Sequence, residues 1–244
     1  MSGRDPKLSS NSGVDDVEDS CDLATAVLAE IAKEPTFRGP ETSAQALVGG
    51  LACVARCWAL LRSMRTLAGL GQFDVLGVLM RPLFETWVLG FLLVWGDEAD
   101  LERVRRHSQN NLQSLGRAGW AGLPDLGEEG ANWRFADRVQ RVGVVFELHG
   151  EDGSIPRATY DMVYRAESIT DVHAGFESIY RHVEQDSGGG LGIVLDGGDA
   201  EQLPGLAKLK IASVLCAQLA AAVWRFGGED GSAFDRLCTG ALDP

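Results

Sequence analysis

The chain has 244 residues, of which 45% are hydrophobic, and its 35 acidic and 22 basic side chains give a formal net charge of −13. A chain of this length and apolar content can bury the core of one domain. The excess of acidic residues argues against nucleic acid as a partner, because phosphates bind where basic side chains gather.

The order of apolar and polar segments predicts helices joined by loops. Residues 1–19 are polar and acidic and predict a disordered leader, and residues 228–244 predict a flexible tail. Between them, residues 20–227 are expected to form one helical domain. A short strand is expected at 193–195, inside the glycine-rich loop 187–205. Apolar residues at helical spacing place helices at 20–34, 42–67, 73–95, 97–115, 132–148, 157–169, 173–185 and 206–226.

The predicted fold is all-α, a single-domain bundle of about eight helices around segments 42–67, 73–95 and 206–226. The middle segment is apolar on nearly every side, so we expect it to be buried at the centre of the bundle. Pro82 is expected to kink it, because proline removes a helical hydrogen bond. The apolar run at 211–224 is shorter than the ~20 residues that cross a membrane. With no signal-peptide core at the N-terminus, these features predict a cytoplasmic protein without a membrane partner.

No segment has the spacing of a cofactor or metal motif. The glycines at 188–192 lack the Lys-Ser/Thr ending of a phosphate loop, and none of the four histidines stands three residues after a glutamate. Cys53 and Cys57 share a helix face without a second ligand pair, which is typical of small core residues. The odd total of five cysteines indicates reduced thiols. We therefore expect no metal and no cofactor.

Two charged residues interrupt the middle of the apolar segment 73–95: Arg81 and Glu85, on either side of Pro82. At a spacing of four residues they share one helix face. A buried charge is costly unless it is paired, and removing one partner of a buried pair costs about 3–5 kcal/mol. Arginine also has five N–H donors, more than one carboxylate can use. The pattern predicts a polar cluster inside the bundle, with further acceptors beside Arg81.

The helix predicted at 157–169 supplies candidate partners for this pair. Tyr164 and Ser168 share a helix face, and His173 follows a helix break expected at 170–171. If the break redirects His173, these three side chains meet the charged pair across a crevice. The predicted site is a semi-buried cluster of Arg81, Glu85, Tyr164, Ser168 and His173.

The five positions form a sparse pattern: Arg81-Pro82-Leu83-Phe84-Glu85, then Tyr164-x-x-x-Ser168-x-x-x-x-His173. This pattern resembles a bacterial all-helical domain family of unknown function, and the likeness extends over residues 40–225. The resemblance implies the all-α fold and the five cluster positions. It implies no established activity.

A binding role is the first function that fits this cluster. In such a ligand-binding or regulatory module, Arg81 captures the acidic group of a small molecule, and Tyr164 and Ser168 orient it. A purely structural network that fixes the register of apolar helices is an equally strong alternative.

Two other classes of function stay open. In a hydrolase or HEPN-like nuclease, His173 acts as general acid or base, while Glu85 orients it and Arg81 stabilises negative charge. In a non-catalytic scaffold, the chain forms a homo-oligomer through exposed aromatic residues such as Trp120, Trp133 and Phe135.

Overall fold

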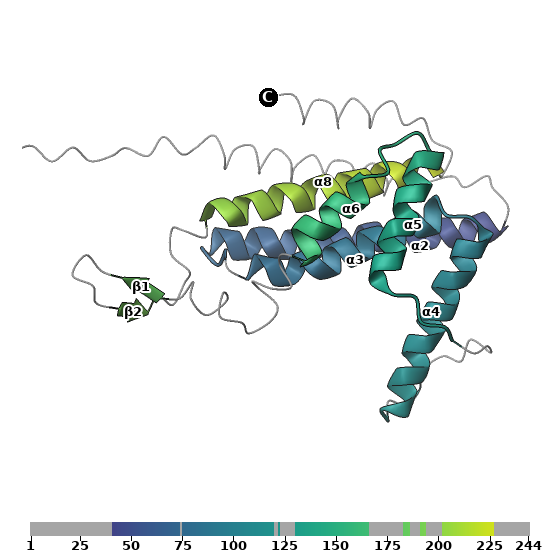
Figure 1. Ribbon diagram of the computed structural model, residues 1–244, viewed down its shortest axis with the longest axis horizontal. Coiled ribbons are helices and arrows are strands. Elements are labelled where there is room, and N and C mark those ends of the chain that lie inside the picture. Colours follow the sequence, from purple (N-terminus) through teal and green to yellow (C-terminus); the bar gives the residue numbers. More distant parts are fainter. Residues whose placement is uncertain are drawn as a thin grey trace, which may run out of the picture.

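The computed structural model describes residues 41–73, 75–119, 122, 130–165, 183–185, 191–193 and 202–226 (Figure 1). These residues form six α-helices: α2 (Glu41–Gly69), α3 (Leu76–Val94), α4 (Glu98–Arg117), α5 (Phe135–Leu148), α6 (Ile155–Thr159) and α8 (Gln202–Phe226). A π-helical segment, η1 (Tyr160–Arg165), continues α6. Strand β1 (Val183–Gln185) pairs antiparallel with β2 (Leu191–Ile193). The described part of the chain is therefore helical apart from one short hairpin, which confirms the all-α class.

Helices α2, α3 and α8 lie side by side and form a three-helix core (Figure 1). Their facing side chains are almost fully buried, with Met64, Trp87 and Leu219 each at 0% exposure. Two glycines allow the helices to approach closely. A Cβ at Gly50 would lie 2.5 Å from Val94 Cγ1, and a Cβ at Gly90 would lie 2.5 Å from Leu219 Cδ1. The core therefore depends on small residues at helix contacts as well as on apolar bulk.

The remaining helices surround one side and one end of this core. Helix α4 leaves the end of α3 at an angle and extends away from the core (Figure 1). Helix α5 packs on α3 through Phe146, whose ring centroid lies 4.7 Å from that of Phe91 and 5.6 Å from that of Trp87. Segment η1 also contacts α3, so α5 and η1 cover α3 in addition to α2 and α8.

The predicted element boundaries agree with the structure for the long helices and fail between residues 155 and 193. The helix predicted at 157–169 begins at Ile155 and becomes the π-helical η1 at Tyr160. The helix predicted at 173–185 is wrong at its end, because residues 183–185 are strand β1. The strand expected at 193–195 occurs two residues earlier. The leader, the tail and the helix predicted at 20–34 lie outside the described residues.

The exclusion of a membrane was wrong, and with it the assignment to the cytoplasm. Three helical segments are long and apolar enough to cross a membrane by length and composition: Gln45–Gly69, Leu76–Val94 and Gly205–Phe226. The sequence argument failed because it measured uninterrupted apolar runs. The helices continue past the charged residues and Pro82 that end those runs, so each has the length that a span needs.

Candidate functional site

Arg81 and Glu85 lie on a partly exposed stripe of α3. Arg81 Nε is 3.3 Å from Glu85 Oε1, and the two side chains are 32% and 39% exposed. Pro82 and Leu89 share this partly exposed stripe. The two side chains are therefore partly buried, at the edge of the core and not inside it. An ion pair with this exposure contributes at most about 1 kcal/mol, well below the cost of breaking a buried pair.

Tyr164 joins this pair, as the sequence predicts. Arg81 Nη2 donates a hydrogen bond to the Tyr164 hydroxyl at 2.5 Å, and the Arg81 Cζ atom lies 4.4 Å from the centroid of the tyrosine ring. Two further rings hold Tyr164 in place: Tyr160, stacked at 5.2 Å, and Phe135, at 4.6 Å. The rings of η1 and α5 therefore fix the phenol against the guanidinium of α3.

The environment of Tyr164 keeps its phenol protonated. Burial raises the pKa of Tyr164, and the negative charge of Glu85 raises it further, while the positive charge of Arg81 opposes both. A neutral phenol can donate a hydrogen bond as well as accept one. The cluster therefore combines a cation, a carboxylate and a neutral hydroxyl.

The other two predicted cluster residues, Ser168 and His173, lie outside the described residues. The structure thus brings together Arg81, Glu85 and Tyr164, and the hydrolase and nuclease hypotheses, which depend on His173, stay predictions. Two aromatic residues named for self-association are only partly exposed. The Phe135 ring packs against Tyr164 at 4.6 Å, and the Arg103 Cζ atom lies 5.8 Å from the Trp133 ring.

A cavity of about 360 Å³ adjoins this cluster between α2, α3 and α5. Its walls are mostly small or apolar, with Ala52 and Cys53 from α2 and Pro82 and Leu89 from α3. Three charged side chains also line it: Arg56 from α2, Glu85 from α3 and Arg138 from α5. The cavity is open to solvent and combines apolar walls with three charged groups.

Arg138 is the residue of this cavity that the sequence analysis missed. Its Nε is buried and has no hydrogen-bond partner among the described residues. Burial lowers the pKa of Arg138, and the nearby Glu85 and Tyr164 oppose this effect. Its guanidinium carbon lies 5.0 Å from the Phe135 ring centroid. Because arginine keeps its charge in proteins, Arg138 is a partly buried cation with one unpaired buried donor among the described residues.

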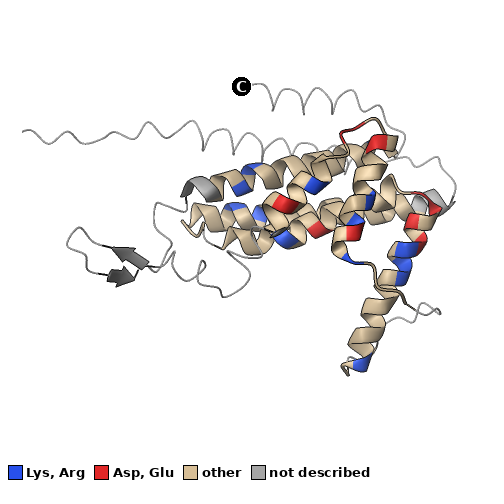
Figure 2. Ribbon diagram, viewed as in Figure 1, with Lys and Arg blue, Asp and Glu red and all other residues tan. Residues whose placement is uncertain are grey.

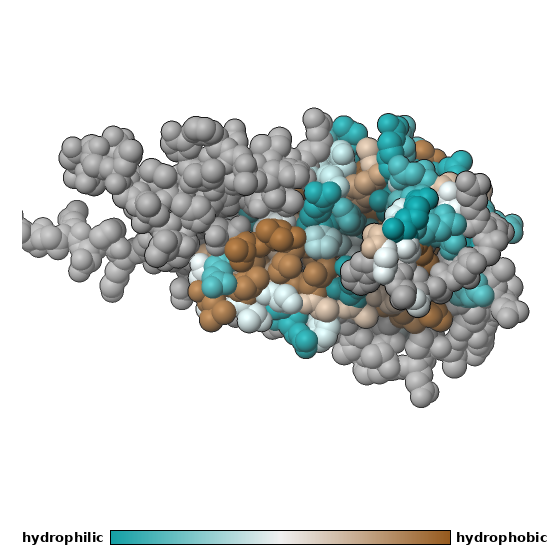
Figure 3. Space-filling view, turned by 90° about the horizontal axis from the view of Figure 1, so that it is seen from below, coloured by the Kyte–Doolittle hydropathy of each residue, from teal (hydrophilic) through white to brown (hydrophobic). Residues whose placement is uncertain are grey.

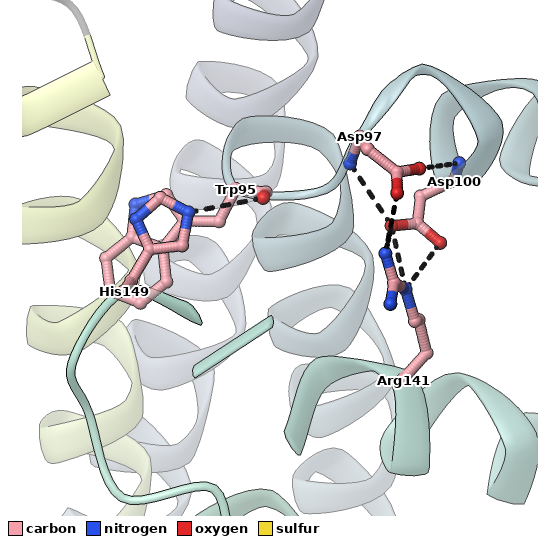
Figure 4. Close-up of polar contacts among 5 residues, drawn as sticks. All are labelled: Trp95, Asp97, Asp100, Arg141 and His149. Atoms are coloured by element: carbon pink, nitrogen blue, oxygen red, sulfur yellow. Dashed lines mark hydrogen bonds and ion pairs between the residues drawn. The ribbon is translucent and has the colours of Figure 1, made fainter. Parts of the chain in front are cut away.

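A second polar cluster, at the junction of α3 and α4, is fully paired (Figure 4). Asp97 precedes α4 and accepts the backbone N–H of Asp100 at 2.9 Å, while the Asp100 carboxylate accepts the backbone N–H of Asp97 at 3.1 Å. Arg141 of α5 donates to Asp100 from Nε at 2.9 Å and from Nη2 at 2.8 Å, and also to Asp97 from Nη2 at 2.8 Å. The reciprocal cap starts α4, and the arginine attaches it to α5.

The same junction is packed by an aromatic contact. The His149 and Trp95 rings stack with centroids 4.6 Å apart and an interplanar angle of 14°, and His149 Nε2 lies 3.3 Å from the Trp95 carbonyl oxygen (Figure 4). No cavity residue takes part in these contacts. Among the described residues, this second cluster therefore has the features of a structural joint.

Comparisons with family models, with curated proteins and with solved structures find no match to this chain. The resemblance to a helical family of unknown function therefore stays a prediction.

Proposed function

We propose that the protein binds a small anionic molecule in the cavity between α2, α3 and α5. The observation that carries this proposal is Arg138, a partly buried cation whose buried Nε has no hydrogen-bond partner among the described residues and whose side chain lines the cavity. A buried donor without a partner is destabilising by itself, so native proteins rarely retain one without a reason. A carboxylate or phosphate oxygen supplies the missing acceptor.

The charges around the cavity favour a monoanion with a short apolar part. Arg56 and Arg138 carry two positive charges, and Glu85 carries one negative charge, which leaves a net charge of +1 for the ligand to balance. The apolar walls, including Cys53 and Leu89, fit a short aliphatic or aromatic group. Arg138, which lines the cavity, takes the role of capturing the acidic group.

Arg81 and Tyr164 then act as positioning residues for Glu85. Arg81 Nε holds Oε1 of Glu85, and the Tyr164 ring lies under the guanidinium. This arrangement keeps the Glu85 carboxylate at the cavity wall. The carboxylate then repels any ligand whose second negative charge would lie beside it. Ser168 and His173 remain part of the proposal as predicted additions to the same cluster.

The predicted bend of α3 at Pro82 belongs to this proposal. Pro82 lines the cavity, and its carbonyl oxygen accepts the Thr86 hydroxyl at 2.7 Å. A proline cannot donate a backbone hydrogen bond to the preceding turn, and a bend there separates α3 from a neighbouring helix. The space between α2 and α3 that the cavity occupies is consistent with such a bend.

A thermal-shift screen with matched arginine variants tests this function. Acetate, benzoate, succinate, inorganic phosphate and AMP are added separately to the parent protein, to Arg138→Gln and to Arg134→Gln. Arg134 is the control because it directly precedes α5, the helix that carries Arg138. Its side chain is 78% exposed and pairs with Asp137. Binding raises the melting temperature by mass action, so a ligand at 100 times its Kd adds about 2.7 kcal/mol.

We expect at least one monoanion to stabilise the parent and Arg134→Gln but not Arg138→Gln. Succinate should stabilise less than benzoate, because its second carboxylate meets Glu85. If no anion stabilises the parent, or if Arg138→Gln responds like the parent, the proposal is wrong.

A further inference from the structure

One end of the three-helix core combines exposed apolar side chains with basic ones. At this end α2 turns into α3 and α8 begins, and Phe73 of the turn packs over Gly205 of α8, where a Cβ would lie 2.5 Å from the phenylalanine ring. Leu70 and Val78 are 69% and 49% exposed there. Figure 3 shows hydrophobic residues gathered over this end of the molecule, which is also the left end in Figure 1. We refer to residues 62–79 and 202–210 as the tip.

The tip is basic although the protein is acidic. Its sequence contains four basic residues, Arg62, Arg65, Lys208 and Lys210, and one acidic residue, Asp74, which gives a net charge of +3. The whole chain has a net charge of −13. Figure 2 shows basic residues at the tip end of the core and residues of both signs at the opposite end, where Arg141 pairs with Asp97 and Asp100. The charge distribution therefore orients the tip toward a negatively charged surface.

We infer that the tip docks on an anionic lipid bilayer, with Leu70 and Val78 inserted among the acyl chains and the four basic residues at the phosphate level. Apolar side chains at a loop between helices with lysine and arginine beside them match the two parts of such an interface. Long basic side chains also reach the headgroups while their aliphatic stems stay near the apolar region. This inference is independent of the proposed ligand cavity.

Charged residues along the core confine lipid contact to the tip. The three segments long enough to cross a membrane include Arg56, Arg81 and Glu85, whose side chains are exposed or partly exposed on the outer surface of the core. Tyr164 of η1 and Arg138 of α5 cover the same stretch of α3. A transmembrane position would place these charges, and the unpaired backbone groups at helix ends, in hydrocarbon. Such groups cost free energy there unless they have partners inside the protein. A bilayer in contact with the tip alone leaves all of them in water.

Exposed apolar side chains elsewhere do not have this combination. Leu148 of α5 is 73% exposed, but the charged residues next to it in the sequence are acidic: Glu147, Glu151 and Asp152. Single exposed apolar residues are normal on protein surfaces. Leu148 therefore serves as a matched control for the tip.

Vesicle flotation with the full chain tests the inference. Phosphatidylcholine vesicles with and without phosphatidylglycerol are compared at low and high salt, using the parent, Lys208→Gln/Lys210→Gln, Leu70→Ser/Val78→Ser and the control Leu148→Ser. The parent and the control should float with the anionic vesicles only, and less at high salt. Loss of two lysines should weaken binding more than roughly tenfold, since each basic residue contributes roughly fivefold at an anionic surface.

The Leu70→Ser/Val78→Ser variant should also lose binding while keeping the parent's melting temperature, because both side chains are exposed. Four results would overturn the inference: equal flotation with neutral vesicles, no flotation of the parent, parent-like binding of both tip variants, or resistance to carbonate extraction, which indicates a spanning protein. Light scattering adds a fifth. If the apolar tip variant changes the oligomeric state without vesicles, a second copy of the chain covers the tip instead.

Discussion

Arg138 and Arg141 stand three residues apart on α5, yet their surroundings are opposite. Arg141 donates hydrogen bonds to the buried carboxylate of Asp100 and to Asp97. Arg138 faces a cavity and has a buried Nε without a partner among the described residues. One turn of helix thus separates two kinds of site. The saturated cluster of Asp97, Asp100 and Arg141 has its charges paired, whereas Arg138 has a donor without a partner among the described residues.

The surroundings of the two arginines distinguish a charge that stabilises the fold from a charge that is available to a ligand. Asp100 is 1% exposed and has its charge fully compensated. Such a network stabilises a helix junction only while both signs are present, because each charge is desolvated for the other. The charge of Arg138 is compensated only at a distance, by Glu85, so a bound anion stabilises the charged guanidinium.

The largest expected effect comes from removing each arginine in turn. Arg141→Met should lower the free energy of unfolding by about 3–5 kcal/mol, because it leaves the Asp100 carboxylate buried without its cation. Arg138→Met should change it by less than about 1 kcal/mol or raise it, because an unsatisfied donor is replaced by an apolar chain of similar volume. Urea unfolding followed by circular dichroism measures both. Equal losses in the two variants would remove the distinction between the clusters.

A smaller effect is expected at the half-exposed pair of the cavity cluster. Glu85→Gln should change the free energy of unfolding by no more than about 1 kcal/mol, since Arg81 and Glu85 are partly solvated. It should also lower the pKa of Tyr164, because the Glu85 charge helps to raise that pKa. The alkaline absorbance change of tyrosine, assigned by its loss in Tyr164→Phe, measures the shift.

The control for this titration is Asp161→Asn, in the same segment but paired with Arg157. It should leave the Tyr164 transition in place. A Tyr164 transition that is identical in Glu85→Gln and the parent would show that the carboxylate does not act on the phenol.

The long helices could be predicted from the sequence because their signals are local. The helix expected at 73–95 is observed at Leu76–Val94, and the helix expected at 206–226 at Gln202–Phe226. Asp97 was placed correctly at the start of a helix, since its cap involves only neighbouring residues. Burial was predicted less well. Arg81 and Glu85 occupy an outward stripe whose other members are apolar, and periodicity does not reveal an apolar stripe that faces solvent or a cavity.

Contacts between distant segments were predicted unevenly. Tyr164 was matched to Arg81 across 83 residues by reasoning about unused donors, whereas the Arg141 contact with Asp100, across 41 residues, was missed. A usable signal existed for Arg138: it stands three residues after Phe135 and four before Val142, on the apolar face of its own helix. A charged residue on the apolar face of a helix is a signal that applies to Arg138 as well as to Arg81.

The smallest effect expected is the acid dependence of the saturated cluster. The backbone N–H of Asp100 and the charge of Arg141 lower the pKa of Asp97 below its ordinary 3.8. As the pH falls, the unfolded chain takes up a proton at this position before the folded one does, so the stability from Asp97 is present above pH 3.8 and is lost below it. Asp97→Asn keeps a good N-cap but has no such charge. Its melting temperature should therefore fall less than the parent's between pH 5 and pH 3, whereas Val144→Thr, an uncharged change on the exposed side of α5, should follow the parent. Parallel curves for Asp97→Asn and the parent would mean that Arg141 and the α4 cap stabilise the junction without using the charge of Asp97, and the saturated cluster would then depend on Asp100 alone.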